Sequence, residues 1–337
     1  MESHLSGLRF ALIMGSIVPN RHGTKRRHPG GSVKSKLTLV GLDIEGEWNV
    51  PLLANAAEMS GASLLFASST RPKSDVNGTN DPSARIDELL SQFDHVLACE
   101  ATRQSRPVYQ YPAPRGHLGV IVGNEQRGIS GKVLKKVDQV VSIPMSGRGM
   151  SSVNVAVAAA IILCALERDL GRRRIRTLPL LQSDVDVLLL GPPDPSELGS
   201  LLRSAWAFGW QHVFLADRDR VWFTKDRPTV LAGRAAARGE VNRIAVRPHE
   251  QLMPEEYDRI IICGNVGSGT PLSRFSLPNR GRILLVYGDG DLPFAMSESV
   301  EQVHVDHAVP DVTPRFRHGG SILLSVISQQ LRRDRRG

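Results

Sequence analysis

Short apolar runs alternate along this chain with longer segments that carry apolar residues at helical spacing. The runs that predict strands are residues 37–42, 64–67, 95–99, 118–122, 185–190, 212–215, 259–263 and 283–287. The segments between them have the 3.6-residue periodicity of amphipathic helices. Strands that alternate with helices form parallel sheets covered by helices on both faces. The pattern therefore predicts an α/β fold with mostly parallel sheets.

The first half of the pattern recurs in the second half. The segment QFDHVLACEATRQSRPV parallels EYDRIIICGNVGSGTPL, so that Cys99 corresponds to Cys263. GVIVGNEQRG then parallels ILLVYGDGD, and GMSSVNVAVAAAII parallels FRHGGSILLSVIS. A long internal repeat indicates that one domain occurs twice. We expect a basic N-terminal extension (1–36), a first domain (37–169), a basic linker (170–183) and a second domain (184–332).

Two loops of the first domain have the form of a ligand site. The strand at 118–122 runs into a polar turn, GNEQRG, at 123–128. A strand at 140–144 precedes a Gly- and Ser-rich loop and an Ala- and Val-rich helix that begins near Ser152. A helix N-terminus presents free backbone N–H groups to whatever lies in front of it. Each loop alone is a plain α/β turn, but the two in this order favour a binding site.

These segments resemble motifs two and three of the SpoU (TrmH-like) branch of the SPOUT superfamily, and the resemblance extends over most of the chain. It implies a methyltransferase that uses S-adenosyl-L-methionine and methylates ribose 2′-hydroxyls in tRNA or rRNA. It also implies a deep trefoil knot in the first domain, an exception to the general absence of knots, and leaves open whether the second is knotted. The residues it assigns to the cofactor are Val122, Gly123, Asn124, Glu125, Gly128, Ile143, Pro144, Met145, Ser152 and Val153.

The family's first motif has the form Asn-x-Gly-x-x-x-Arg-x-Ala and ends in Gly. Residues 49–61, NVPLLANAAEMSG, fit this frame, but Pro51 replaces its Gly and Asn55 stands where the family carries a reactive arginine. In the second half, ELGSLLRSAWAFG repeats the motif and supplies that arginine as Arg203, although Glu197 replaces the leading Asn.

The two copies depart from the family at complementary positions. Asn124, Glu125, Ser152 and Asn154 of the first copy become Asp289, Gly290, Gly319 and Ser321 in the second. The first copy has therefore kept the pocket, and the second has kept the arginine. In the family the active sites lie at a homodimer interface, where this arginine reaches the pocket of the partner subunit. The resemblance thus implies an intramolecular pseudo-dimer, able to act as a monomer, in which Arg203 reaches the cofactor held by the first half.

The resemblance assigns catalysis to Arg203, Asn49, Glu125, Ser152 and Asn154. A ribose hydroxyl is a poor nucleophile at neutral pH, so a group must accept its proton as the methyl group moves. Because arginine is normally locked in its charged form, a bidentate clamp on the adjacent phosphate is as good a role for Arg203 as a base. Structural alternatives are a solvated helix residue for Arg203, helix caps for the Asn and Ser residues, and a helix-start acid for Glu125.

Composition agrees with a polyanionic partner such as RNA. The 337 residues carry a net charge of +8, and basic residues cluster at 21–36, in GRRRIR from Gly171 and in the tail RRDRRG. We expect the tail to be solvated, whereas RNA contact and solvation are equal alternatives for the first cluster. No apolar run is long enough to span a membrane. Three cysteines without CxxC spacing suit a reducing, cytoplasmic location.

Other interpretations stay open. The departures at Pro51, Asn55 and Glu197 leave a peptide or small-molecule acceptor on the same scaffold as an alternative. A non-catalytic RNA-binding relic is a third, against which the intact GNE and SSVN motifs weigh. CGNVGSG has a phosphate-loop composition but no following helix. HVDH, from His304 to His307, predicts a surface strand rather than a metal site, because no further ligands are apparent.

Overall fold

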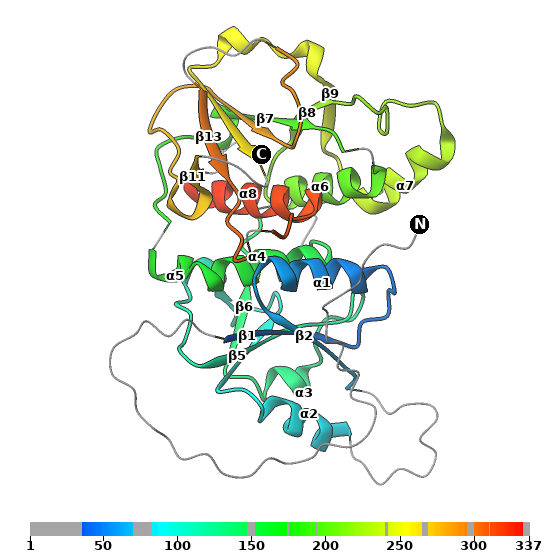
Figure 1. Cartoon of the computed structure of the whole chain (residues 1–337), viewed down its shortest axis with the longest axis vertical. Coiled ribbons are helices and arrows are strands. Elements are labelled where there is room, and N and C mark those ends of the chain that lie inside the picture. Colours follow the sequence, from blue (N-terminus) through cyan, green and yellow to red (C-terminus); the bar gives the residue numbers. More distant parts are fainter. Residues whose placement is uncertain are drawn as a thin grey trace.

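A computed structural model of the chain describes residues 36–69, 82–146, 152–173, 175–192, 194–239, 242–264, 269–294, 300–309 and 311–332. The basic cluster at 21–35 and the last five residues of the tail lie outside these ranges, and so does most of CGNVGSG. The described elements form two sheets with layers of helices between them (Figure 1).

The first sheet has six parallel strands in the order β2-β1-β5-β3-β6-β4. Its strands are β1 (Lys36–Leu42), β2 (Ser63–Ala67), β3 (His95–Cys99), β4 (Arg106–Pro107), β5 (His117–Val122) and β6 (Gln139–Ser142). The central strand β5 alternates between two cores: Val120 lies in the larger one and Ile121 in a smaller one. The larger core contains α1 (Asn49–Met59) and α4 (Val155–Glu167). The smaller one contains α2 (Pro82–Leu90) and α3 (Gly131–Leu134), so helices cover both faces, as predicted.

The second sheet has seven parallel strands in the order β11-β13-β10-β12-β7-β8-β9. Its strands are β7 (Val185–Leu190), β8 (His212–Ala216), β9 (Ala245–Pro248), β10 (Arg259–Gly264), β11 (Thr270–Pro271), β12 (Ile283–Tyr287) and β13 (Val300–His304). The helices of this half are α6 (Pro195–Ala207), α7 (Arg227–Ala237) and α8 (Phe316–Gln330). The α/β fold with mostly parallel sheets is therefore confirmed.

The two sheets share one topology. The order β8-β7-β12-β10-β13-β11 repeats β2-β1-β5-β3-β6-β4, and among the described strands only β9 has no counterpart. Local details repeat as well: the carboxylate of Asp94 accepts a hydrogen bond from the backbone N–H of His117 at 2.8 Å, and that of Asp258 accepts one from Arg282 at 2.8 Å. These matches support the predicted duplication, which stays a prediction about the origin of the chain.

Two details differ from the sequence-based predictions. The outer face of the second sheet carries 3₁₀ turns at His249–Gln251 and Pro254–Glu256 instead of a regular helix. Leu252 and Tyr257 pack on that face, and the prolines at 248 and 254 interrupt any longer helix because proline lacks the N–H that a helix interior needs. The surface strand predicted over HVDH is wrong too, since β13 ends at His304 and the buried Asp306 accepts hydrogen bonds from Ser273.

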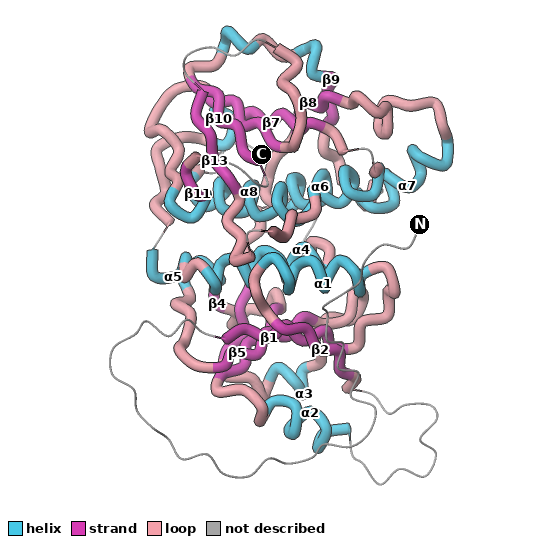
Figure 2. The backbone as a smooth tube through the Cα atoms, in the orientation of Figure 1, coloured by secondary structure: helices cyan, strands magenta, loops and turns pink. Residues whose placement is uncertain are grey.

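The helix layers of the two halves face each other and pack directly (Figure 2). One core runs through both halves, and Leu53 of α1, Ile161 of α4, Leu201 of α6 and Leu323 of α8 belong to it. Burying apolar side chains from four helices in a shared core holds the two sheets in one arrangement. Among the described helices, none combines the length and the apolar character needed to cross a membrane.

Candidate functional site

The turn after β5 is held in one conformation by Asn124. Its Nδ2 donates to the Asp43 carbonyl at 2.8 Å, and its Oδ1 accepts from the backbone N–H groups two and three residues further on, at 2.9 and 3.0 Å. Gly128 closes the turn at a φ of 66° and donates to the Asn124 carbonyl at 2.9 Å. A side chain there would meet the Glu100 carboxylate at 2.4 Å, so the turn requires glycine.

A chain of hydrogen bonds joins Glu125, Asn49 and Asn154. Asn49 Nδ2 donates to Glu125 Oε1 at 2.6 Å, and Asn154 Nδ2 donates to Asn49 Oδ1 at 3.1 Å. The backbone N–H groups of Glu45 and Gly46 also donate to the Glu125 carboxylate. Burial raises the pKa of Glu125, but the hydrogen bonds from its own backbone, Asn49, Glu45 and Gly46 outweigh burial and lower it. These hydrogen bonds therefore hold an ionised carboxylate beside the start of α1, and Asn49 links it to the start of α4.

The structure separates the capping alternatives. Asn154 is the N-cap of α4, because its Oδ1 accepts from the N–H groups of Ala156 and Val157 at 2.9 and 3.4 Å. The helix therefore begins three residues after Ser152, which does not cap it. Asn49 lies inside α1, and Glu125 lies in the turn after β5 rather than at a helix start. Capping alone thus accounts for Asn154, but not for Ser152, Asn49 or Glu125.

Arg203 of α6 reaches from the second half to the first. Its Nε donates to the Ser152 carbonyl at 3.1 Å, and its Nη2 donates to Ser152 Oγ at 3.0 Å. The side chain is 8% exposed. Burial, followed by the nearby charge of Arg238, lowers the pKa of Arg203 to about 10. Within the described ranges no acidic side chain pairs with it, so a buried cation lies against the loop before α4 without a carboxylate.

Helix α6 is fixed in the position that this contact requires. Its start is capped by Asp194, which accepts from the N–H of Ser196 at 2.7 Å, and Pro195 occupies its first position. Gly199 then lets α7 approach, because a side chain there would lie 2.1 Å from the Gly233 carbonyl. The backbone of Arg203 is therefore set by a cap at one end and a close helix contact along its side.

The segment after β6 leaves the sheet and is tied to the second half. The predicted strand at 140–144 ends at Ser142, and Ile143, Pro144 and Met145 lie outside regular structure. Ser146, which sequence reasoning missed because no motif marks it, donates through its N–H to the Ala207 carbonyl at 3.1 Å and through Oγ to the Phe208 carbonyl at 2.6 Å. The C-terminal end of α6, the helix that carries Arg203, thus holds the segment from Ile143 to Ser146 through these two hydrogen bonds.

These loops combine apolar side chains with backbone groups that lie outside the strand ladders. Ile143 is buried, while Met145 and Val153 are partly buried against the larger core. Val122 ends β5, and a side chain on Gly123 would meet the Gly128 backbone at 2.6 Å. Apolar side chains beside backbone groups outside strand ladders are typical of small-molecule sites. Trp48, which sequence reasoning also missed, is 62% exposed and directly precedes Asn49; an aromatic residue before the first motif is the only signal for it.

In the second half, the positions that correspond to Asn49 and to the loop before α4 are occupied by an ion pair and by a helix. Glu197, the counterpart of Asn49, is buried and lies 2.9 Å from Arg317 Nε, while the N–H of Arg317 donates to its other oxygen at 2.9 Å. Helix α8 already includes Gly319 and Ser321, the counterparts of Ser152 and Asn154. A turn of helix and an ion pair thus stand where the first half has the non-helical residues 152–154 and Asn49.

The chain is similar over a short segment to curated proteins described as tRNA/rRNA methyltransferases. A curated relative from Mycobacterium bovis, described as an uncharacterized tRNA/rRNA methyltransferase, is 46% identical over 59 residues. The aligned segment is 18% of this chain and 17% of the relative, so the chain spans about a sixth of that relative's length.

Solved structures of SpoU proteins overlap with part of the chain. The SpoU methyltransferase AviRb from Streptomyces viridochromogenes is 21% identical and covers 43% of this chain and 62% of its own, with a TM-score of 0.32. The TrmH/SpoU tRNA modifying enzyme from A. aeolicus is 20% identical and covers 44% and 84%, with a TM-score of 0.33.

The family model extends over the whole first sheet and over most of α4. It is that of the SpoU rRNA Methylase family, and it matches residues 36–164. This range contains the GNEQRG turn, the SSVN segment and the hydrogen-bonded chain from Glu125 to Asn154. The model of the SpoU rRNA Methylase family thus matches the part of the chain, less than half of its length, in which the motifs resemble this family.

Proposed function

We propose that this chain is an S-adenosyl-L-methionine-dependent methyltransferase that methylates ribose 2′-hydroxyls of tRNA or rRNA. The observation that carries the proposal is the pair of hydrogen bonds from Arg203 to Ser152. They join the one arginine of the repeated motif to the half that matches the SpoU family model. A buried guanidinium that has no carboxylate partner within the described residues, and that contacts a loop with motif residues, is typical of a functional site.

The cofactor would be held by Val122 to Gly128, by Ile143 to Met145 and by Ser152 and Val153. The apolar side chains of Ile143, Met145 and Val153 suit its adenine ring, and the tight Gly123 turn brings backbone groups close to it. S-adenosyl-L-methionine, when bound, supplies a methyl group on a positively charged sulfur. The donor set of these loops therefore fits the cofactor.

Positioning is the task of the hydrogen-bonded chain. Asn49, Glu125 and Asn154 fix the starts of α1 and α4 relative to the GNEQRG turn. Aligning the attacking oxygen with the methyl carbon and the sulfur in this way is worth roughly 7–11 kcal/mol in favourable systems. A shift of the loop before α4 would disturb that alignment, so we expect activity to depend on these residues more steeply than cofactor binding.

Arg203 has two available roles. A pKa of about 10 lies closer to neutrality than that of an exposed arginine, which favours a base. The guanidinium nevertheless stays mostly charged at pH 8, and the charged form is the one that clamps a phosphate through two hydrogen bonds. In either role one arginine and one pocket, on opposite halves, complete a single site within one chain. The predicted knot and the monomeric state belong to this proposal as well.

The experiment is transfer of labelled methyl from S-adenosyl-L-methionine to total RNA, followed by digestion to nucleosides. Arg203→Ala is measured in parallel, with Arg259→Ala as an exposed arginine control at the start of β10. We expect label in a 2′-O-methyl nucleoside, lost in the Arg203 variant and kept in the control. No label in RNA while the cofactor still binds would refute an RNA acceptor and direct the search to peptides and small molecules.

A further inference from the structure

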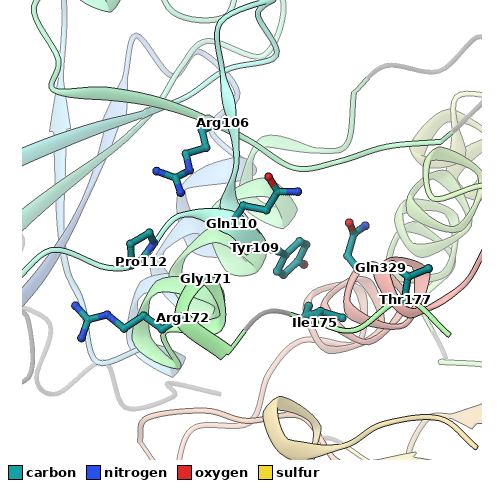
Figure 3. A pocket seen from close by; sticks show the side chains of 9 residues that line it. All are labelled: Arg106, Tyr109, Gln110, Pro112, Gly171, Arg172, Ile175, Thr177 and Gln329. Atoms are coloured by element: carbon teal, nitrogen blue, oxygen red, sulfur yellow. The ribbon is translucent and has the colours of Figure 1, made fainter.

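A cleft lies at the junction of the two halves, away from the loops of the candidate site. Its cavity volume is about 840 Å³. The first half contributes the segment around β4 and the 3₁₀ turn Val108–Gln110. The linker contributes residues of α5 (Leu170–Arg173) and of the segment that follows it, and α8 contributes Gln329. Figure 3 shows the side chains of Arg106, Gln110 and Gln329 around this cleft.

The walls of the cleft are held rigidly. A side chain on Gly171 would lie 2.0 Å from the Tyr111 carbonyl, so α5 packs directly on the backbone of the first half. Tyr109 closes the other side, where its hydroxyl and Ser325 Oγ of α8 lie 2.7 Å apart in a buried hydrogen bond. A ligand would therefore meet a preformed surface, which reduces the ordering cost of binding.

The cleft is positively charged. Two of the nine residues that line it are arginines, Arg106 and Arg172, and none is acidic. Arg106 is exposed, lies 5.7 Å from the centre of the Tyr111 ring, and has no ion pair within the part of the chain that is described. Arg172 pairs with Asp169 at 3.0 Å, but that carboxylate does not line the cleft.

More basic residues flank the cleft in the linker, where the sequence reads GRRRIR. Arg173 and Arg176 are both exposed. The amide side chains of Gln110 and Gln329 add hydrogen-bond donors that can reach phosphate or sugar oxygens. Exposed guanidinium groups with amide donors and no carboxylate in the lining are the groups that bind an RNA backbone.

The cleft cannot hold the nucleotide that reacts at Arg203. It lies at the C-terminal end of α4, whereas Ser152 precedes the N-terminal end. The 13 residues of α4 separate the two by about 20 Å at 1.5 Å per residue. One strand of nucleic acid rises about 3.4 Å per nucleotide, so about six nucleotides would span that separation.

We propose that this cleft binds the sugar–phosphate backbone of the substrate RNA, outside the nucleotide that is methylated. The proposal rests on the proposed function, because it takes RNA as the acceptor. Arg106 would contact phosphate oxygens through its guanidinium, and Arg172, whose Nε pairs with Asp169 and whose Nη2 donates to the Ala113 carbonyl, would add positive charge. Such contacts provide affinity without sequence preference. Because the linker contributes part of the lining of the cleft, it would form part of the RNA-binding surface.

The test is the affinity of a labelled single-stranded RNA for the full chain, measured by fluorescence anisotropy over a range of salt concentrations. The variants are Arg106→Ala, Arg172→Ala and the double variant. Lys132→Ala/Lys135→Ala serves as the matched control, because both lysines are exposed at α3 on the opposite face of the first sheet (Figure 1). We expect the double variant to weaken binding roughly tenfold and to reduce the salt slope by about 1.4, at about 0.7 per lost phosphate contact.

Equal affinity and equal salt slope for the double variant and wild type would overturn the proposal. The proposal would also be overturned if inorganic phosphate abolished the difference in RNA affinity between the double variant and wild type. The cleft would then be a site for small anions. Arg106→Ala removes no ion pair, so it remains informative if Arg172→Ala unfolds the linker. Methyl transfer is measured separately: RNA binding that depends on these arginines without any methylation by wild type would refute the proposed function alone.

Discussion

Arg203 and Asn55 occupy corresponding positions on α6 and α1, and each reaches across the junction toward the start of the other half's last helix. Arg203 donates to the carbonyl and hydroxyl of Ser152. Asn55 donates to the Thr313 carbonyl at 3.2 Å and accepts from the Arg315 N–H at 3.1 Å. The crossing is therefore the same on both sides, but a charged group makes it on one side and a neutral amide on the other.

Arg203→Lys is expected to reduce methyl transfer about 100-fold or more, because the ammonium keeps the charge but loses the paired contact to Ser152. Cofactor affinity should change little, since the loops that would hold it belong to the first half. Single-turnover methylation and calorimetric titration of the cofactor measure the two effects. Arg259→Ala should resemble wild type in both, and equal rates for Arg203→Lys and wild type would exclude a role for the guanidinium.

The dependence of the methylation rate on pH separates the two roles of Arg203. Burial lowers its pKa to about 10, so the charged form persists throughout the neutral range. For a phosphate clamp we expect a single-turnover rate that is flat between about pH 7 and pH 9 and falls as the pH rises through about 10, where the charge is lost. A rate that instead rises about tenfold per pH unit up to about pH 10 would identify Arg203 as a base.

Asn154→Ala should lower the free energy of unfolding by about 1–2 kcal/mol. The substitution removes the N-cap of α4 and the donor to Asn49. Denaturation in urea measures the change. Asn279→Ala is the control, because that side chain is exposed and should cost less than about 0.5 kcal/mol. Equal losses in the two variants would show that the cap contributes nothing specific.

His318 should make the fold less stable in mild acid. It is completely buried beside Arg317 and Arg315, and burial, followed by these charges, lowers its pKa to about 3. Its neutral form is favoured in the folded state, so stability is full above its unfolded pKa of about 6.5 and declines as the pH falls toward about 3.

The slope expected from this single group is about 1.4 kcal/mol per pH unit between about pH 6 and pH 4. Urea denaturation at several pH values measures it. His318→Gln, which cannot take up a proton, should lose this component while other acid-labile groups keep theirs. An identical pH dependence in the variant and wild type would show that His318 is not buried in neutral form.

We expect one cofactor molecule per chain. The position of the second half that matches the cofactor loops is occupied by the Glu197–Arg317 ion pair and by the first turns of α8. Phe316 also packs on Tyr287 there, with ring centres 5.0 Å apart. Calorimetric titration of the full chain should give a stoichiometry of one, and two equal sites would contradict the filled second position.

Much of the fold was predictable from local pattern. Strands such as the one that contains Leu118 are continuous apolar runs in the sequence. Each of the eight strands predicted from these runs appears in the structure within one residue of its predicted limits. The edge strands β4 and β11 escaped detection because each has two residues, one of them proline, and therefore no periodicity to read.

The site was predictable only as a set of residues. The motifs grouped Asn49, Glu125 and Asn154 as site residues. Which of them hydrogen-bonds to which depends on the distances between α1, α4 and the turn after β5, and no local sequence pattern records those distances. Nor could sequence show that Asn154 rather than Ser152 caps α4, since both residue types are good caps. The catalytic and cofactor roles of these residues stay predictions.

Joining both halves in one chain has a consequence for how an acceptor is presented. In a twofold-symmetric assembly, turning the acceptor end for end produces an equivalent complex, because every residue occurs on both sides. Here Arg203 contacts Ser152 on one side of the junction, whereas the corresponding Asn55 contacts Thr313 and His318. The two ways of laying an acceptor across the molecule are therefore not equivalent, so the RNA strand that we propose as acceptor would have one productive polarity.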